Sequence, residues 1–476
     1  MAELNKEPQD KRFPFVVDGL RGDVPTNFYP ASDSERGVIL YPTPGLLTHC
    51  TLTDCSEIRG LRAWGDYLYG VARRGGDSVL WRIDAAGAFS ELGIMATSAS
   101  GALWMENNST QLLIADGVSG YVYTPSTNVF VQITDLDFPA AAMCVYQDGY
   151  GLFFEPNTNR WFHSELHDFL DFDALDFYTK QSTPDDIISM LSFARELYIF
   201  GKVKGTEVWY NYGGDNSSAS NPTFARNTGG LIEHGCGAAR SPSTFDGERV
   251  TWITDQGQLI QAIRYETQIV SNQMFDRALR DYTLYSDAIA FSYRDQGHVF
   301  YQVSFPTADE TWVLDGNTKI FHKRESYKAA GGYGRHRANC YALLNGVHYV
   351  GDYTNGKIYK MSTNYLDDDG ETIRRRVYST EWEGGLNRMY FPAVQVLVEP
   401  GVGLVGVTDP QISLEWSNNG GYTWSTEQTR SVGATGEYGA RAIWQQVGSG
   451  FRRMYRITMT DPVVWRILGV DWGGFQ

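Results

Sequence analysis

The stretch YLYGVARRGGDSVLWRID, residues 67–84, decides the expected fold. Two runs of alternating apolar and polar residues flank Gly75 and Gly76, and the second run carries Trp81. An alternation with a period of two is typical of half-buried β-strands, and glycines supply the positive φ that tight hairpin turns require. The sequence therefore predicts a β-hairpin at this place.

The same hairpin pattern recurs through most of the chain. Seven hairpins occur, and the second strand of each is marked by one large residue at intervals of 40 to 53 residues: Trp81, Tyr121, Trp161, Trp209, Leu259, Trp312 and Tyr359. This spacing suits repeats of four strands, which cannot bury both faces alone and pack radially as propeller blades. We predict an all-β fold with a seven-bladed β-propeller over residues 51–366; six blades are the alternative.

The segments outside the repeat differ in character. Residues 1–50 are rich in Pro and Gly and are expected to form an extended N-terminal arm, of the kind that closes a ring or reaches a neighbour. Residues 367–476 contain longer strand patterns, with Ile412, Leu414 and Trp416 on one face, and predict a C-terminal β-sandwich. Short amphipathic stretches at 164–178 and 272–285 predict two helical insertions.

Composition narrows the class of protein. The charge of −16 argues against a surface that wraps nucleic acid, although a passive conduit for DNA remains open. No apolar run is long enough to span a bilayer, and the charged N-terminal residues lack the apolar core of a secretory signal, so we expect synthesis in a cytoplasm. The five cysteines are odd in number and widely spaced, which predicts free, small apolar side chains: Cys50, Cys55, Cys144, Cys236 and Cys340.

One group of side chains has a spacing that suits a metal ion. His163 and His167 are four residues apart, as a helical ligand pair would be, and Asp168 follows. The favoured interpretation is the polar face of a short linker helix, and the acidic residues that follow are taken as a solvated surface. Residues 367–371, DDDGE, lack the ligand spacing of a calcium loop and are expected to form an interdomain turn. We predict no metal site, no cofactor and no catalytic residues.

Residues 417–424, SNNGGYTW, form the most specific short motif. They resemble the Asp-box hairpin of sialidases, with Asn419 in place of the aspartate, and in that family the box is a structural turn. A single copy outside the propeller predicts a hairpin. Basic residues cluster at three places and are expected to be paired or solvated, with contacts to other subunits or to the DNA backbone as the alternative: Arg335-His336-Arg337, Arg374-Arg375-Arg376 and Arg452-Arg453-Arg456.

Residues 184–210, PDDIISMLSFARELYIFGKVKGTEVWY, resemble a hairpin of the tail accessory, or packaged-DNA stabilisation, proteins of short-tailed bacteriophages. Further similar stretches run from about residue 25 to 430, among them NFYPASDSERGVILYPTPGLL, LIEHGCGAARS, GRHRANCYALLNGVHYVGDYTNGKIYKM and WSNNGGYTWS. Similarity is weak in the last fifty residues.

The resemblance implies a structural virion protein without catalytic residues. Such a protein would form a homohexameric tail hub or nozzle ring beneath the portal and the head-to-tail adaptor. It would retain packaged double-stranded DNA, pass it during ejection, and contact a tail needle and fibres or spikes. Two alternatives stay open: a sialidase-like propeller hydrolase acting on host surface glycans, and a non-viral interaction propeller.

Overall fold

The computed structural model describes residues 24–33, 37–96, 98, 100–183, 185–218, 220–401 and 407–473. Two compact units are present: Leu46–Thr311 with Arg335–Ser362, and Trp312–Gly334 with the described parts of Met1–Gly45 and Thr363–Gln476. Helix α1 (Gln273–Asp281) is the only helix among the described residues. It is not long and apolar enough to span a membrane.

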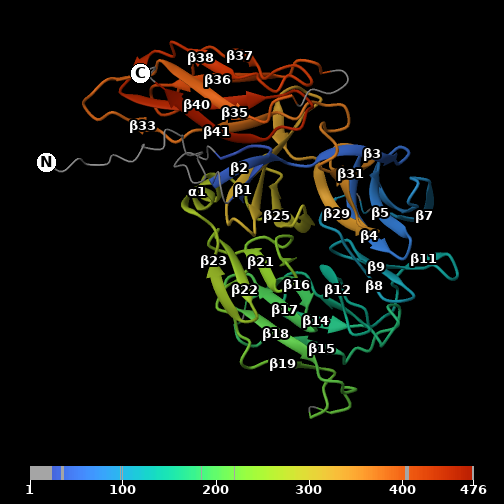
Figure 1. The fold of residues 1–476 in the computed structure, drawn as a ribbon. Helices are drawn as coiled ribbons and strands as arrows, with labels where there is room; N and C mark the ends of the chain where they lie inside the picture. Colours follow the sequence, from blue (N-terminus) through green and yellow to red (C-terminus); the bar gives the residue numbers. More distant parts are fainter. Residues whose placement is uncertain are drawn as a thin grey trace. The chain divides into compact units, whose positions relative to one another are not determined.

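Seven sheets follow one another along the chain as the blades of a β-propeller, which confirms the predicted number. In Figure 1 the labels of the successive sheets lie around a common centre. Blades one to three consist of β4 (Glu57–Trp64), β5 (Tyr67–Arg74), β6 (Asp77–Ile83) and β7 (Phe89–Met95); β8 (Trp104–Asn107), β9 (Leu112–Ala115), β10 (Gly120–Thr124) and β11 (Val129–Gln132); and β12 (Met143–Gln147), β13 (Tyr150–Phe154), β14 (Arg160–His163) and β15 (Phe177–Thr179).

Blades four to six continue the same antiparallel order. They consist of β16 (Ile187–Phe193), β17 (Glu196–Gly201), β18 (Thr206–Asn211) and β19 (Phe224–Arg226); β20 (Ser243–Phe245), β21 (Arg249–Ile253), β22 (Leu259–Ile263) and β23 (Glu266–Ile269); and the five strands β24 (Ile289–Asp295), β25 (His298–Phe305), β26 (Glu310–Asp315), β27 (Phe321–Tyr327) and β28 (Tyr333–Arg335).

The seventh blade combines the two ends of the propeller sequence. Strands β29 (Ala338–Leu344), β30 (Val347–Asp352) and β31 (Lys357–Ser362) are joined at the outer edge by β3 (Gly45–Thr51). The backbone N–H of Leu52 donates to the carbonyl of Gly356 at 2.8 Å just beyond this strand. An early strand that pairs with the last blade closes the propeller and covers the edge of β31.

The large residues that mark the repeat all occupy the third strand of their blades and are buried. They pack in layers between neighbouring blades. One layer joins Leu152 and Trp161 of blade three to Leu197 and Trp209 of blade four. The core of the propeller is thus a series of inter-blade layers, which is why each blade needs its neighbours.

The C-terminal part forms a β-sandwich, as predicted. One sheet has the order β1 (Phe28–Asp33), β2 (Gly37–Pro42), β41 (Ile467–Gly473), β35 (Ala393–Val398) and β38 (Ala442–Gln445). The other contains β32 (Arg375–Tyr378), β40 (Arg452–Met459), β36 (Gln411–Ser417) and β37 (Gln428–Ser431), with β33 (Trp382–Glu383) paired to β40; β34 (Met389–Tyr390) and β39 (Ser449–Gly450) form a small separate pair. Trp444 and Trp465 are fully buried in the shared core.

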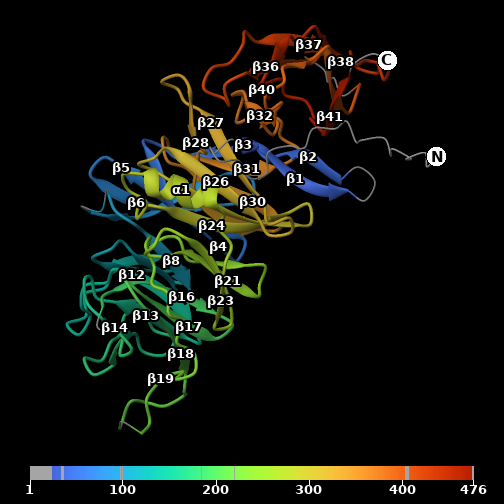
Figure 2. The same ribbon diagram turned by 90° about the vertical axis from the view of Figure 1, so that its left-hand side faces the viewer.

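The segment expected as an extended arm over residues 1–50 contains strands, of which β1 and β2 form a hairpin (Figure 2). Leu40 pairs with Ile467, and Phe28 and Leu40 lie in the sandwich core. The prolines that suggested an arm are compatible with this sheet, because Pro30 lies on the edge strand β1, where a missing N–H is tolerated. Residues 1–23 lie outside the described part of the chain.

Of the two predicted helices only the second exists. Helix α1 begins after Asn272, whose side chain accepts a hydrogen bond from the N–H of Phe275 as an N-cap. Residues 164–178 instead form successive turns that end in β15, with His167 at a φ of 63°. Asp168 and Asp173 each accept a hydrogen bond from the backbone N–H two residues later, at 3.0 and 2.9 Å, which favours turns over a helix.

A polar network fixes the hairpin β17–β18, which carries the stretch quoted for the resemblance. The Asp185 carboxylate accepts hydrogen bonds from Lys180, from the Thr183 hydroxyl at 2.6 Å, and from the backbone N–H of Val203 at 2.8 Å. Burial opposes its charge, but these donors outweigh burial and lower the pKa of Asp185 to about 2. The buried Glu207 accepts the indole N–H of Trp209 at 2.9 Å in the same hairpin.

Replacing Trp161 by alanine is expected to destabilise the propeller by about 3–5 kcal/mol, because a cavity would replace the ring. Its centroid lies 4.6 Å from that of Tyr178 and 5.2 Å from that of Trp209. Chemical denaturation followed by circular dichroism measures the change. The matched control is Tyr212→Ala, since that side chain is 54% exposed. Equal losses in the two variants would contradict the inter-blade packing.

The Asp185→Asn variant is expected to be less stable than the wild type near neutral pH and to lose less stability in acid. The folded pKa of about 2 lies below the ordinary value of about 3.9, so the carboxylate stabilises the fold above about pH 4 and stops doing so as pH falls toward 2. Thermal midpoints recorded across this range test the difference. Asp186→Asn is the control, and an identical acid response in both variants would refute the assignment.

Candidate functional site

A cavity of about 530 Å³ lies on the axis of the propeller, entirely within the first unit. The first strands of the blades line it, together with residues 239–244, which lead into β20. A volume of this size is typical of small-ligand sites. Its charged lining residues, among those the structure describes, are Arg59, Arg62, Glu106 and Arg240.

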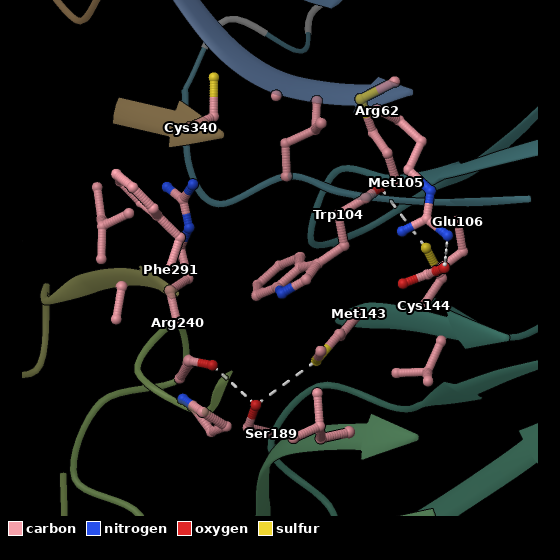
Figure 3. Close-up of a pocket in the computed structure, with 18 of the residues that line it drawn as sticks. Arg62, Trp104, Met105, Glu106, Met143, Cys144, Ser189, Arg240, Phe291 and Cys340 are labelled. Atoms are coloured by element: carbon pink, nitrogen blue, oxygen red, sulfur yellow. Dashed lines mark hydrogen bonds and ion pairs between the residues drawn. The ribbon is translucent and has the colours of Figure 1, made fainter. Parts of the chain in front are cut away.

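Arg62 and Glu106 form an ion pair across neighbouring blades. The two side chains approach to 2.7 Å, and Arg62 Nε also donates to the Asn107 side-chain oxygen at 2.9 Å. Burial raises the pKa of Glu106, and the Arg62 guanidinium opposes that shift. Figure 3 shows this pair beside Cys144. Both groups have their partners within the chain.

Arg59 is held entirely by neutral acceptors. Its guanidinium donates to the Ser78 hydroxyl at 2.7 Å and to the carbonyls of Ser98, Ser100 and Gly101. These contacts tie β4 to the segment that enters blade two. Burial lowers the pKa of Arg59. Among the described residues no carboxylate forms an ion pair with it, although the charges of Glu57 and Asp116 favour its charged form.

Arg240 lies on the opposite side of the cavity, near Phe291 and Cys340 (Figure 3). No hydrogen bond or ion pair joins its guanidinium to any residue that the structure describes. Burial lowers the pKa of Arg240, the nearby Cys340 and Glu57 oppose this shift, and the charge of Arg59 adds to it. The residue is partly exposed and lines the cavity. The cavity therefore contains one cation with unused hydrogen-bond donors.

The remaining lining residues are mainly apolar, and several have polarisable aromatic or sulfur-containing side chains. Trp104 projects toward the middle of the cavity between the two charged sides, and Met143 lies below it (Figure 3). The Ser189 hydroxyl donates to the carbonyl of Ala239 at 2.8 Å. Burial raises the pKa of the lining Cys340 to about 12, so its thiol stays protonated at neutral pH.

All five cysteines are free, and four are buried while Cys55 is partly exposed. The sequence prediction that they act as small apolar side chains agrees with these positions. The sequence analysis did not predict the cavity, because the residues that mark the repeat lie on the third strands, whereas the first strands line the cavity. One sequence signal could have indicated the cavity: an arginine recurs near the start of two blades. Arg59 lies in the first strand of blade one, and Arg240 lies just before β20, the first strand of blade five.

The metal candidates are not brought together as a ligand set. His163 ends β14, is buried, and bonds through Nδ1 to the carbonyl of Ser164 at 2.9 Å. His167 lies in a turn, and Asp168 accepts a hydrogen bond from Gln111 at 3.0 Å. Among the described residues, no group of three or more histidine, cysteine or carboxylate side chains is arranged to hold a metal ion.

The basic run Arg374-Arg375-Arg376 serves the second unit. Arg374 forms two hydrogen bonds with Glu325, at 2.6 and 2.8 Å. Arg375 is fully buried, and burial lowers its pKa to about 10 despite the attraction of Asp368. Arg376 donates to the Thr458 hydroxyl at 3.3 Å. The acidic turn at 367–371 therefore packs beside this run.

The arginines of the last basic cluster also bind partners within the sandwich. Arg452 pairs with Glu381 at 2.6 Å, and Arg456 binds Glu415 through two hydrogen bonds of 2.7 and 2.6 Å. Arg453 is buried and donates to a backbone carbonyl at 2.8 Å. These arginines stabilise strand β40, as the paired interpretation predicted.

The cluster at 335–337 is likewise engaged within the first unit. The Arg335 guanidinium lies 3.6 Å from the ring centroid of Tyr353. His336 is buried and contacts the Gln302 amide at 3.3 Å. Arg337 interacts with Tyr359. Each of these three side chains therefore has a contact within the chain.

The Asp-box-like residues form the predicted structural turn after β36. Asn419 accepts the N–H of Thr423 at 3.0 Å and donates to its hydroxyl at 2.9 Å. The Ser417 hydroxyl accepts the N–H of Gly421 at 2.9 Å. Asn419 thus satisfies the backbone in the way expected of the aspartate. Trp424 packs under Arg456 at 4.3 Å.

Comparisons with known proteins cover both structural parts. The family described as "Bacteriophage P22 Gp10, beta-propeller" matches residues 25–365, and the family described as "Bacteriophage P22 Gp10, beta-sandwich" matches residues 378–471. No curated protein sequence matches the chain.

Among solved structures, the N-terminal domain of Nup159 is similar with a TM-score of 0.42 and 8% identity, over 71% of this chain and 99% of that one. A computationally designed protein, Ika8, is similar with a TM-score of 0.39 and 12% identity, over 66% and 99%. Because the propeller match alone spans most of the sequence, and the sandwich match follows it in order, the chain belongs to the bacteriophage P22 Gp10 family of tail accessory, or packaged-DNA stabilisation, proteins.

Proposed function

We propose that six copies of this structural tail protein form the hub or nozzle ring below the portal and the head-to-tail adaptor. The ring would retain packaged DNA and conduct it during ejection. The family membership carries this proposal, since both matches belong to a phage tail protein. Rigid blades and a sandwich suit large stationary interfaces between copies and neighbours, because propellers leave only short, protected sheet edges.

The path for DNA would lie between copies rather than through one propeller. The axial cavity of about 530 Å³ is the size of a small-ligand site and is lined by side chains from all seven blades. A double helix, whose major groove alone admits a whole α-helix, is far too wide for it. The conduit therefore requires an assembly, which is consistent with a ring of several subunits.

The conduit is proposed to let DNA slide instead of gripping it. Six copies carry a formal charge of 6 × (−16) = −96, which repels phosphates. The arginine runs that could have clamped the backbone already pair with carboxylates, as Arg374 does with Glu325 and Arg456 with Glu415. Adaptor, tail needle and fibres or spikes are the proposed protein partners.

The hydrolase alternative finds less support in the structure. A sialidase-like site would need several guanidinium groups free to bind one carboxylate, together with an acid and a base. Of the three arginines that line the cavity, Arg59 and Arg62 are engaged by the chain itself. The only lining carboxylate among the described residues, Glu106, is engaged by Arg62.

Quantitative mass spectrometry of purified virions is expected to give six copies of the chain, and electron microscopy is expected to place them as a ring at the tail. The isolated chain, measured by light scattering, is the comparison, because the ring can require the adaptor to form. A different copy number, or a position away from the tail, would overturn the proposal.

The purified chain is expected to bind duplex DNA weakly, and less as salt rises through the physiological range, because few free cations meet the phosphates. Fluorescence anisotropy with a labelled random-sequence duplex measures this. The Glu325→Gln and Glu415→Gln double variant, which releases Arg374 and Arg456 from their pairs, should bind more tightly. Tight binding by the wild type would rule out a sliding conduit.

A further inference from the structure

We propose that the axial cavity of the propeller is a binding site for a small organic anion, held by Arg240 through a carboxylate or phosphate group. This inference concerns a single subunit and does not depend on the ring or on DNA. It rests on three observations: the charge of the lining, the unused donors that face the cavity, and the flat apolar surfaces beside them.

The lining carries more positive than negative charge. Arg59, Arg62 and Arg240 face one carboxylate, Glu106, so the formal count is three positive minus one negative, or +2. Glu57 stands nearby without lining the cavity, and Asn339 donates to it at 3.2 Å. A buried charge without a partner is unfavourable, and an anion that enters the cavity would relieve it.

Two donors face the cavity without a partner among the described residues. The guanidinium of Arg240 is one, and the indole N–H of Trp104 is the other, although the Trp104 carbonyl accepts from the Cys144 thiol at 3.6 Å. Figure 3 shows both side chains in the cavity, with no dashed line to the guanidinium of Arg240 or to the ring of Trp104. A planar guanidinium binds both oxygens of one carboxylate or phosphate at once, which a water molecule cannot match.

The rest of the lining selects the body of the ligand. The Trp104 ring, Met143 and Phe291 present apolar and polarisable surfaces, on which a sugar or aromatic ring can pack. Ser189, by contrast, already donates to Ala239. The ligand class is therefore a ring-sized molecule with one anionic group, for example a sugar acid, a sugar phosphate or an aromatic acid.

The full-length chain is titrated by isothermal calorimetry with glucuronate, glucose 6-phosphate, benzoate and inorganic phosphate, and with neutral glucose as the comparison. Saturable binding of at least one ring-bearing anion, without binding of glucose, is expected. Glucuronate or benzoate alone would identify a carboxylate site, and glucose 6-phosphate alone a phosphate site. Binding of inorganic phosphate only would overturn the ring-bearing class, and binding of none of the probes would overturn the site.

Arg240→Leu is expected to weaken the binding by about tenfold or more, because a charge-assisted hydrogen bond is lost. Arg240→Lys keeps the charge but loses the planar fork, so an intermediate affinity is expected. The control is Arg195→Leu, an identical change at a guanidinium whose side chain is 85% exposed. If Arg240→Leu folds with an unchanged circular dichroism spectrum and binds like the wild type, the assignment fails.

Discussion

The packing of each blade against the next is the constraint on which the propeller depends. A four-stranded sheet of short strands has two apolar faces, and a single blade exposes both of them to water. The third strand supplies one large buried residue per blade, such as Trp161 in blade three or Trp312 in blade six. Removing a blade would therefore expose two layers at once, and β3 has to complete the seventh blade before the ring can close.

The ion pairs inside the chain follow from a second constraint, the unfavourable burial of an unpaired charge. Charges that enter the interior must find partners, and the chain provides them locally: Lys180 for Asp185, Glu325 for Arg374, and Glu415 for Arg456. Such pairs engage part of the 40 lysines and arginines, and the formal net charge of the chain is −16.

The repeat made the propeller predictable, because one marker residue per blade follows directly from a buried third strand. The sandwich was predictable from the alternation at Ile412 and Leu414. The helix expected at 164–178 was wrong, because apolar residues spaced as on a helix also suit successive turns in which aspartates such as Asp168 hold the backbone. The strand character of β1 and β2 was hidden by prolines: Pro30 lies on the edge strand β1, and Pro42 ends β2. The cavity could not be predicted, since its residues are up to 282 positions apart, from Arg59 to Tyr341, and meet only when the propeller closes.

Ring closure also explains why a binding site is expected in a protein built for rigidity. A propeller brings the first strand of every blade to its axis, and the side chains of these strands converge there whether or not a ligand is present. Most of the convergent polar groups here are used to connect neighbouring blades, as Arg59 and Arg62 are. Arg240 is different, because a leucine or methionine would fill the same place without an uncompensated charge. An unpaired guanidinium beside Trp104 lowers the stability of the fold. A bound anion would compensate this charge, which explains why an arginine stands at this position.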